Sequence, residues 1–208
     1  MATIDPHMST PASVTPPASR GSQLSMGMLA MIFFLGSEAM LFASFFTAYF
    51  FVRFNVADQW PPDGPNGEPY ELPIIITGIN TLILVSSSFT MHWAEHRFRH
   101  YGDRVALRRG LIVTIFLGAT FLLLQLNEYA HLDFTPQSGA FGSTFFTLTG
   151  LHGLHVLVGL TILWIMLRRV VVAHDFKPTW FTPLGAGALY WHFVDVVWVI
   201  LYLLVYIL

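Results

Sequence analysis

Five long apolar stretches constrain this chain more than any other feature of its sequence. They lie at about residues 24–54, 72–94, 109–130, 141–168 and 184–208, and each can cross about 30 Å of hydrocarbon as a helix. Only 11 % of the residues are charged and 54 % are hydrophobic, whereas a soluble domain carries about 25 % charged residues. The sequence therefore predicts an all-α integral membrane bundle of five transmembrane helices.

The first 23 residues differ from the rest of the chain. They read MATIDPHMSTPASVTPPASRGSQ, which is rich in Pro, Ser, Thr and Ala and holds no apolar run. This composition predicts a disordered tail over residues 1–23, followed by one transmembrane domain over residues 24–208. The tail lacks the apolar core of a cleavable signal peptide, so we expect the first helix to act as the insertion signal.

The basic residues indicate how the helices are oriented. Of the ten Lys and Arg residues, nine fall in the tail and in the connections after the second and fourth stretches, and only Arg53 falls on the opposite side. Because basic residues stay on the cytoplasmic side, the pattern predicts the N-terminus inside and the C-terminus outside. The connection HRFRHYGDRVALRR is favoured as a topology anchor against anionic lipid heads, rather than as a binding surface for an anionic partner.

The chain contains no cysteine. This excludes disulfides, iron–sulfur clusters, thiolate copper sites and covalently attached c-type haem. Any metal would have to be bound by histidine, methionine or carboxylate side chains.

Three acidic residues fall within or at the edges of the spans. Glu38 in LGSEAMLFASFF lies near mid-bilayer, Asp195 in YWHFVDVVW lies about halfway along the fifth stretch, and Glu128 in QLNEYAH lies near the outer end of the third. A charged carboxylate at the bilayer centre costs at least about 2.5–3.5 kcal/mol, so such residues face the bundle and have a partner. Two interpretations of Glu38 remain open: it belongs to a proton-relay or ligand site, or it is a hydrogen-bonded acid that joins helices. For Glu128 the second interpretation, a structural role, is favoured.

His192 and Asp195 are three residues apart on one helix face, within reach of each other. Such a pair can shuttle protons, but it can equally satisfy two polar groups that would otherwise be buried alone. The structural pairing is the favoured interpretation.

The segment TGLHGLHVLVGL places His152 and His155 on one helical face deep in the membrane. One haem iron takes axial ligands from opposite faces of the macrocycle, so each histidine would need a second one from another helix. The other intramembrane candidates, His92 and His192, lie toward the cytoplasmic ends of their helices, and the chain lacks the Glu-x-x-His pairs on two facing helices that a di-metal site needs. We therefore expect both imidazoles to bond groups on neighbouring helices. Thr149 and Gly153 form a small-x-x-x-small pair, with Gly150 and Gly159 nearby, which allows another helix to approach closely.

Several ordered motifs identify a resemblance that extends over nearly the whole chain after the tail. They are SEAMLFASFFTAYF at 37–50, WPP at 60–62, SSSFTMHWA at 86–94, NEY at 127–129, FFTLTGLHGLHV at 145–156 and YWHFVDVVW at 190–198. Together they resemble the third subunit of haem–copper respiratory oxidases, and the cytochrome c oxidase subunit III family in particular.

The resemblance implies a subunit without a redox centre of its own, within an enzyme complex that transfers electrons from cytochrome c to oxygen and pumps protons. Haem and copper would lie in partner subunits, and subunits I and II would be the partners. Family members support proton uptake and bind phospholipid in a cleft. By the resemblance, six residues would support the helices, the lipid site and proton uptake without binding metal: Glu38, Glu128, His152, His155, His192 and Asp195.

The chain departs from the family pattern in one respect. Many members have seven helices, whereas this chain resembles a five-helix form that begins at the third, and this leaves the lipid cleft in doubt unless another subunit supplies two helices. The expected location is a bacterial inner membrane, and no nucleic-acid partner is expected. Subunit III of a quinol oxidase is the nearest alternative, and a small proton or solute transporter is a more distant one, although the sequence shows no convincing internal repeat.

Overall fold

The computed structural model describes residues 25–55, 60–64, 67–172 and 181–208. The predicted tail over residues 1–23 lies outside this part of the chain. Within it are five long helices, α1 (Met26–Asn55), α2 (Ile74–Tyr101), α3 (Arg104–Tyr129), α4 (Gly139–Val172) and α5 (Phe181–Tyr202), and α5 continues as a π-helical turn, η2 (Leu203–Ile207). In this described part of the chain, five helices are long and apolar enough to cross a membrane. The predicted all-α bundle of five transmembrane helices is confirmed.

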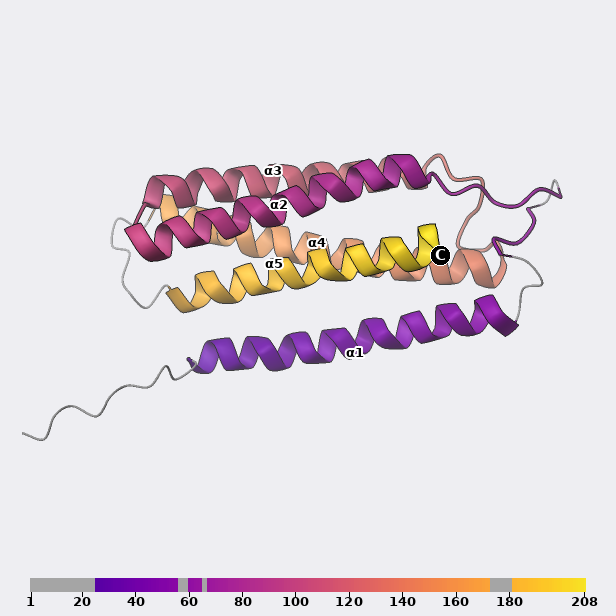
Figure 1. The fold of residues 1–208 in the computed structure, drawn as a ribbon, viewed down its shortest axis with the longest axis horizontal. Coiled ribbons are helices and arrows are strands. Elements are labelled where there is room, and N and C mark those ends of the chain that lie inside the picture. Colours follow the sequence, from indigo (N-terminus) through magenta and orange to yellow (C-terminus); the bar gives the residue numbers. More distant parts are fainter. Residues whose placement is uncertain (1–24, 56–59, 65–66, 173–180) are drawn as a thin grey trace, which may run out of the picture.

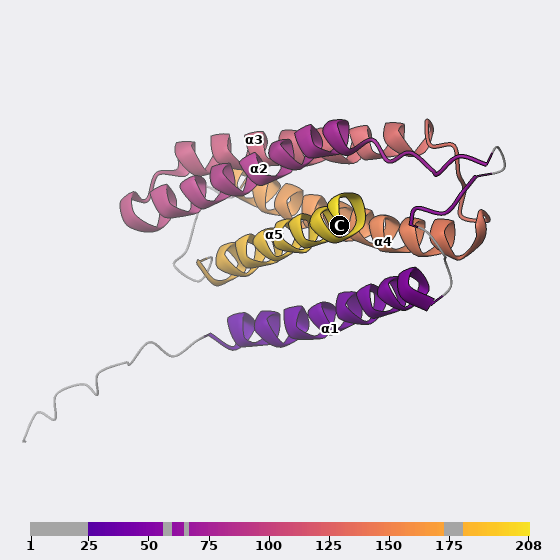
Figure 2. The same cartoon turned by 45° about the vertical axis from the view of Figure 1, so that its right-hand side comes forward.

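The helices run side by side along the long axis of the molecule (Figure 1). In both views α2 and α3 lie together on one side, α4 and α5 lie in the middle, and α1 is the outermost helix on the other side (Figures 1 and 2). The contacts between helices agree with this arrangement. Among the described helices, α2 and α3 pack most extensively against each other, and α1 makes its extensive contacts with α4 and α5. The core therefore lies between α2, α3, α4 and α5.

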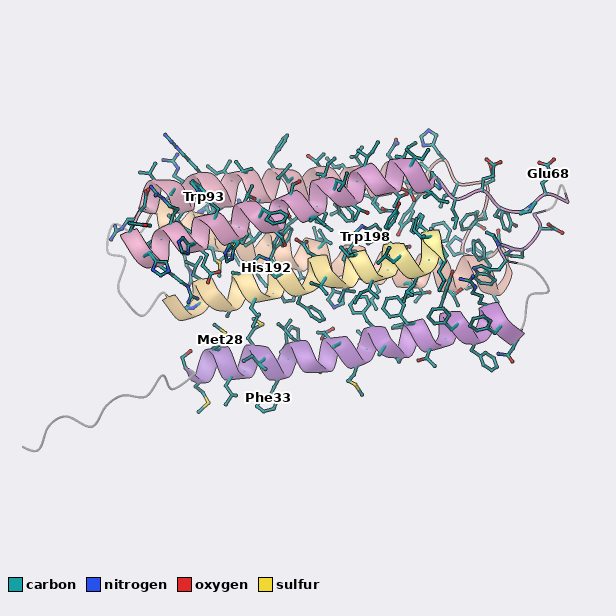
Figure 3. The ribbon with its side chains drawn as sticks, viewed as in Figure 1. Met28, Phe33, Glu68, Trp93, His192 and Trp198 are labelled. Carbon is teal, nitrogen blue, oxygen red and sulfur yellow. The ribbon has the colours of Figure 1, made fainter. Side chains whose placement is uncertain are left out.

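Exposed apolar side chains cover the outside of the bundle. Phe33 of α1 is 72 % exposed and points away from the other helices, while Trp198 of α5 is fully buried between them (Figure 3). A chain with such a surface is suited to hydrocarbon rather than water.

The connection between α2 and α3 is shorter than the sequence analysis predicted. Helix α2 continues to Tyr101 and ends at Gly102, whose left-handed φ of 65° places its N–H 2.9 Å from the carbonyl oxygen of Phe98. Helix α3 begins directly after Asp103, whose carboxylate accepts a hydrogen bond from the N–H of Ala106 at 2.9 Å. This bond holds the pKa of Asp103 below its usual range. Apolar length predicts only the part of a helix within the bilayer, whereas Arg and Glu are good helix formers that extend it beyond.

The starts of α2 and α5 also differ from the spans predicted over residues 72–94 and 184–208. Helix α2 begins at Ile74, directly after Pro73, and α5 begins at Phe181. Shifts of a few residues are usual at helix ends, where hydrogen bonding and backbone angles give different boundaries.

Trp191 of α5 lies at the centre of the core and is fully buried. A Cβ on Gly118 of α3 would come within 2.6 Å of its indole ring, and one on Gly159 of α4 within 2.8 Å. The indole N–H donates to Ser87 Oγ of α2 at 3.0 Å. Four helices therefore meet at one side chain, and the predicted close approach is confirmed at Gly159. At Gly153 the nearest atom to a Cβ would be Leu122 Cδ1 at 3.6 Å, which is ordinary contact.

Candidate functional site

Polar side chains inside the bundle gather in three places. We name them the Glu38–His155 pair, the Glu128 cluster (Thr77, Gln125, Glu128 and Tyr206) and the Asp195 cluster (Ser88, His192 and Asp195). Every one of them joins two or more helices. Five of the six predicted site residues lie in these places, and His152 does not.

The Glu38–His155 pair connects α1 with α4. Glu38 Oε2 lies 2.9 Å from His155 Nε2, and His155 Nδ1 lies 2.8 Å from the carbonyl oxygen of Leu151. Because a carbonyl oxygen can only accept, Nδ1 has the hydrogen of that bond. The Nε2–Oε2 bond then needs one more proton, which resides either on the imidazole as part of an ion pair or on the carboxyl as part of a neutral pair. The pair therefore holds one transferable proton in a mostly buried position.

The Glu128 cluster connects α2, α3 and the C-terminal turn. Glu128 is 6 % exposed, and its two carboxylate oxygens each accept a hydroxyl, from Tyr206 at 2.8 Å and from Thr77 at 2.8 Å. Gln125 Nε2 lies 3.4 Å from the same Tyr206 oxygen. Such a satisfied buried carboxyl agrees with a structural role, since both of its oxygens have partners on other elements.

In the Asp195 cluster, a serine joins the two residues that the sequence places on one face. Ser88 of α2 donates to Asp195 Oδ2, and its oxygen lies 3.0 Å from His192 Nδ1. Asp195 is 4 % exposed, and its Oδ1 has no hydrogen-bond partner among the described residues. Ser88 lies in the SSSFTMHWA motif, and the sequence predicted no role for it. The run of three serines in an apolar helix is the signal that could have identified it.

His152 lies apart from these clusters. Its ring is fully buried, with Trp198 at 4.8 Å and Phe121 at 6.1 Å between ring centroids. Neither ring nitrogen has a hydrogen-bond partner in the described part of the chain. The expectation that both imidazoles bond to neighbouring helices is therefore confirmed for His155 and wrong for His152, because aromatic rings fill the space around its ring.

No group of three or more His, Cys, Asp or Glu side chains within the described ranges is placed to hold a metal ion. The three polar places are instead built from acids, hydroxyls and single imidazoles. Such groups form hydrogen bonds, and their acids and imidazoles are able to exchange protons.

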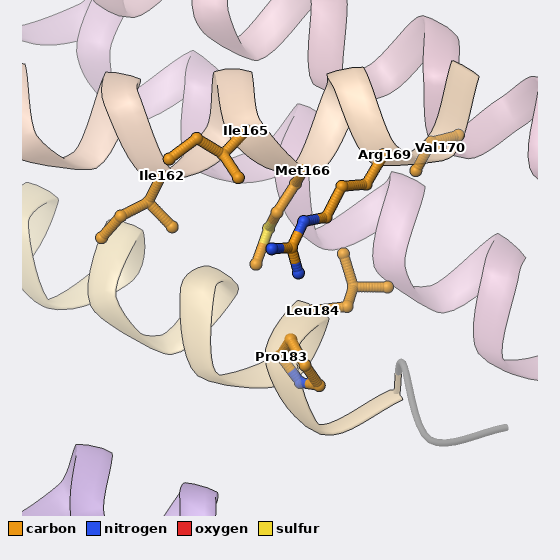
Figure 4. Close-up of a pocket in the computed structure, with 7 residues that line it drawn as sticks. All are labelled: Ile162, Ile165, Met166, Arg169, Val170, Pro183 and Leu184. Atoms are coloured by element: carbon orange, nitrogen blue, oxygen red, sulfur yellow. The ribbon is translucent and has the colours of Figure 1, made fainter. Parts of the chain in front are cut away.

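A pocket lies between the end of α4 and the start of α5, with a volume of about 260 Å³ (Figure 4). Its walls are apolar apart from the guanidinium of Arg169. The other lining residues are Ile162, Ile165, Met166, Val170, Pro183 and Leu184. Figure 4 shows Arg169 between the apolar residues Met166 and Val170, and an apolar wall that includes a cation is suited to an amphipathic molecule with an anionic head.

Comparison with known proteins gives consistent matches over most of the chain. A family model described as cytochrome c oxidase subunit III matches residues 17–208. The chain is 39 % identical over 181 residues to cytochrome c oxidase subunit 3 of Synechocystis sp., and this match covers 87 % of this chain and 75 % of that protein. It is 40 % identical over 197 residues to the protein of the same name from Pan troglodytes, and this match covers 92 % of this chain and 71 % of that protein.

Proposed function

The chain belongs to the cytochrome c oxidase subunit III family, and from this premise we propose that it is a non-catalytic membrane subunit of a proton-pumping haem–copper terminal oxidase. In this role it stabilises the catalytic subunit and its proton uptake, while haem and copper lie in partner subunits. Subunits I and II are the proposed partners, and a bacterial inner membrane, with the N-terminus inside, is the proposed location. The match over residues 17–208 is the observation on which the proposal rests.

The three polar places support a part in proton uptake rather than in electron transfer. Each offers carboxyl, imidazole or hydroxyl groups within the spans, and the Glu38–His155 pair holds one transferable proton at 2.9 Å. Ionisable residues within a membrane mark proton or ion pathways in many proteins. We therefore assign supporting roles in the complex to Glu38, Glu128, His155, His192 and Asp195, and a packing role to His152.

The decisive experiment compares the purified oxidase with and without this subunit, and with the variant Glu38→Ala. We expect an unchanged haem spectrum in all three, because the redox centres lie elsewhere. We expect fewer turnovers before inactivation in the oxidase without the subunit and in the variant. Glu68→Ala is the matched control, since Glu68 is an exposed acid in the loop before α2 (Figure 3). Equal working lifetimes with and without the subunit would refute the proposal.

Phospholipid is the proposed ligand of the subunit, and the pocket at Arg169 supports it. The guanidinium would contact the phosphate, and the apolar wall formed by Ile162 and Ile165 would contact an acyl chain. Phospholipid retained by the purified oxidase, measured by mass spectrometry, tests this directly. Arg169→Gln should lower the retained amount and Arg104→Gln should not, and equal amounts in the two variants would count against this site.

A further inference from the structure

Three histidines line the last three turns of α2, at the end of the bundle where the arginine-rich connection begins. We name His92, His96 and His100 the histidine row; all three are exposed. Ring centroids lie 4.3 Å apart between His96 and His100, and 6.4 Å apart between His92 and His96. His192 of α5, which Figure 3 labels, continues the row. Its ring centroid lies 6.4 Å from that of His92.

The row leads toward the Asp195 cluster. Residues four apart lie on one helix face, about 6 Å further along the axis at each step. Ser88 precedes His92 by the same spacing, and it lies about 20 Å along the axis from the end of α2 at Tyr101. The row, His192 and Ser88 therefore connect the surface with a carboxyl that is 4 % exposed.

The number of hydrogens available at Ser88 determines which atoms donate along this connection. Its hydroxyl has one hydrogen, which it donates to Asp195 Oδ2. When Asp195 is ionised and accepts this hydrogen, the contact with His192 Nδ1 at 3.0 Å needs its hydrogen from the imidazole, and Nδ1 donates to Ser88 Oγ. In the neutral imidazole the other nitrogen, Nε2, is then the acceptor, and it is free to take a proton.

We propose that the histidine row, His192 and Ser88 form a proton relay through which the buried carboxyl of Asp195 exchanges its proton with the aqueous phase. A proton enters at the row and reaches Nε2 of His192, with water bridging the ring-to-ring steps. Nδ1 of His192 then passes its hydrogen to Ser88 Oγ as the Ser88 hydroxyl passes its own to Asp195 Oδ2. One proton enters and one carboxylate becomes a carboxyl, so the step is balanced, and the reverse sequence releases the proton.

Two ion pairs lie beside the row. On α2, Glu95 lies 2.7 Å from Arg99, and Arg97 lies 3.4 Å from Asp103, which precedes α3. On α5, which packs against the same part of α2, the titratable groups that face the row and Ser88 are His192 and Asp195. Because these ion pairs compensate their own charges, the imidazoles of the row are the groups that can accept a proton at one ring nitrogen and release one from the other.

The test is hydrogen–deuterium exchange of the Asp195 carboxyl in the complete oxidase, followed by rapid-mixing infrared spectroscopy. The carboxyl band is assigned by its loss in Asp195→Asn, and its shift in heavy water reports exchange. We expect Ser88→Ala, His192→Phe and His92→Phe to slow exchange by about tenfold or more, since a missing hydroxyl or imidazole breaks the chain of donors and acceptors. Ser88→Thr keeps the hydroxyl and should restore the rate.

Ser86→Ala is the matched control, because Ser86 is on the same helix and its hydroxyl donates to the carbonyl oxygen of Leu82 at 2.7 Å. Exchange in Ser88→Ala as fast as in wild type, or equal slowing in Ser86→Ala, would overturn the relay. So would the lack of an Asp195 carboxyl band at both mildly acidic and mildly alkaline pH. Retention of each variant in the oxidase excludes misfolding. Hydrogen–deuterium exchange at Asp195 is measured without turnover, so this test of the relay does not depend on the proposed function. Only the statement that the oxidase uses the relay rests on that function.

Discussion

Replacing Tyr206 with phenylalanine tests whether the Glu128 cluster holds the bundle together. The change removes only the hydroxyl, which donates to Glu128 Oε1 at 2.8 Å and lies 3.4 Å from Gln125 Nε2. The ring keeps its contact with Phe145, at 5.6 Å between centroids. The variant therefore leaves a buried carboxyl oxygen and a buried amide with one partner fewer, at little cost in packing.

The magnitude follows from two opposing effects. A buried acceptor left without its donor costs about 1–3 kcal/mol in protein interiors. In membranes, hydrogen bonds between helices contribute about 0.6 kcal/mol on average and at most about 1.7, because the unfolded chain also finds partners. Tyr206 is 4 % and Glu128 6 % exposed, so we expect a loss near the upper membrane value, about 1–2 kcal/mol.

Reversible unfolding in mixed micelles measures this loss, and Tyr202→Phe is the matched control. Tyr202 is less buried, and its hydroxyl donates to the carbonyl oxygen of Ile74 at 3.1 Å, where water can replace it. We expect the control to cost less than about 0.5 kcal/mol. A double-mutant cycle of Tyr206→Phe with Glu128→Leu should give a coupling of about 1 kcal/mol. Equal losses in the two tyrosine variants, or a coupling near zero, would refute the reasoning.

Two further predictions concern the packing of the core and the helix ends. Gly118→Ala should destabilise the chain by about 1–3 kcal/mol, because its Cβ would lie 2.6 Å from the Trp191 indole, whereas Gly150→Ala, with no atom within 4 Å, should be neutral or stabilising in the same unfolding assay. Asp103→Ala should lower the unfolding temperature at neutral pH, because the folded-state pKa of this carboxyl lies below its ordinary value of 3.8. Its carboxylate thus stabilises the fold above that value, and the stability is lost as the pH falls through the folded-state pKa. A difference between wild type and variant that persists in strong acid would contradict this assignment.

The sequence was sufficient to predict the spans and the buried acids, for reasons that apply to single helices. An apolar run long enough to cross the bilayer is visible in one segment, and a carboxyl within it needs a partner wherever that partner lies. The partners themselves come from other helices. Ser88 for Asp195 and Thr77 for Glu128 could not be assigned, because their positions depend on how α2 is rotated against α5 and α3.

The surroundings of His152 could not be predicted from the sequence either, because they depend on neighbouring helices. Spacing places it on one face with His155, but only packing decides that His155 meets Glu38 while His152 meets the rings of Trp198 and Phe121. Neighbouring positions on one face therefore have different environments, because a turn of helix is enough to move a side chain from one helix contact to the next.

The Glu38–His155 pair gives a physical reason why the oxidase's working lifetime, rather than its haem content, should respond to Glu38. Helix α1 has the smallest buried share of the five spans, and lipid chains offer its apolar face contacts as good as those of protein. Polar contacts then contribute much of the specificity with which α1 packs, and the 2.9 Å bond to His155 lies in the middle of that helix. Glu38→Ala removes this bond while leaving the apolar contacts of α1, such as that of Phe42 with His155 at 5.0 Å between centroids. We therefore expect an assembled subunit whose first helix is held less firmly, and this would impair sustained turnover before it impaired assembly.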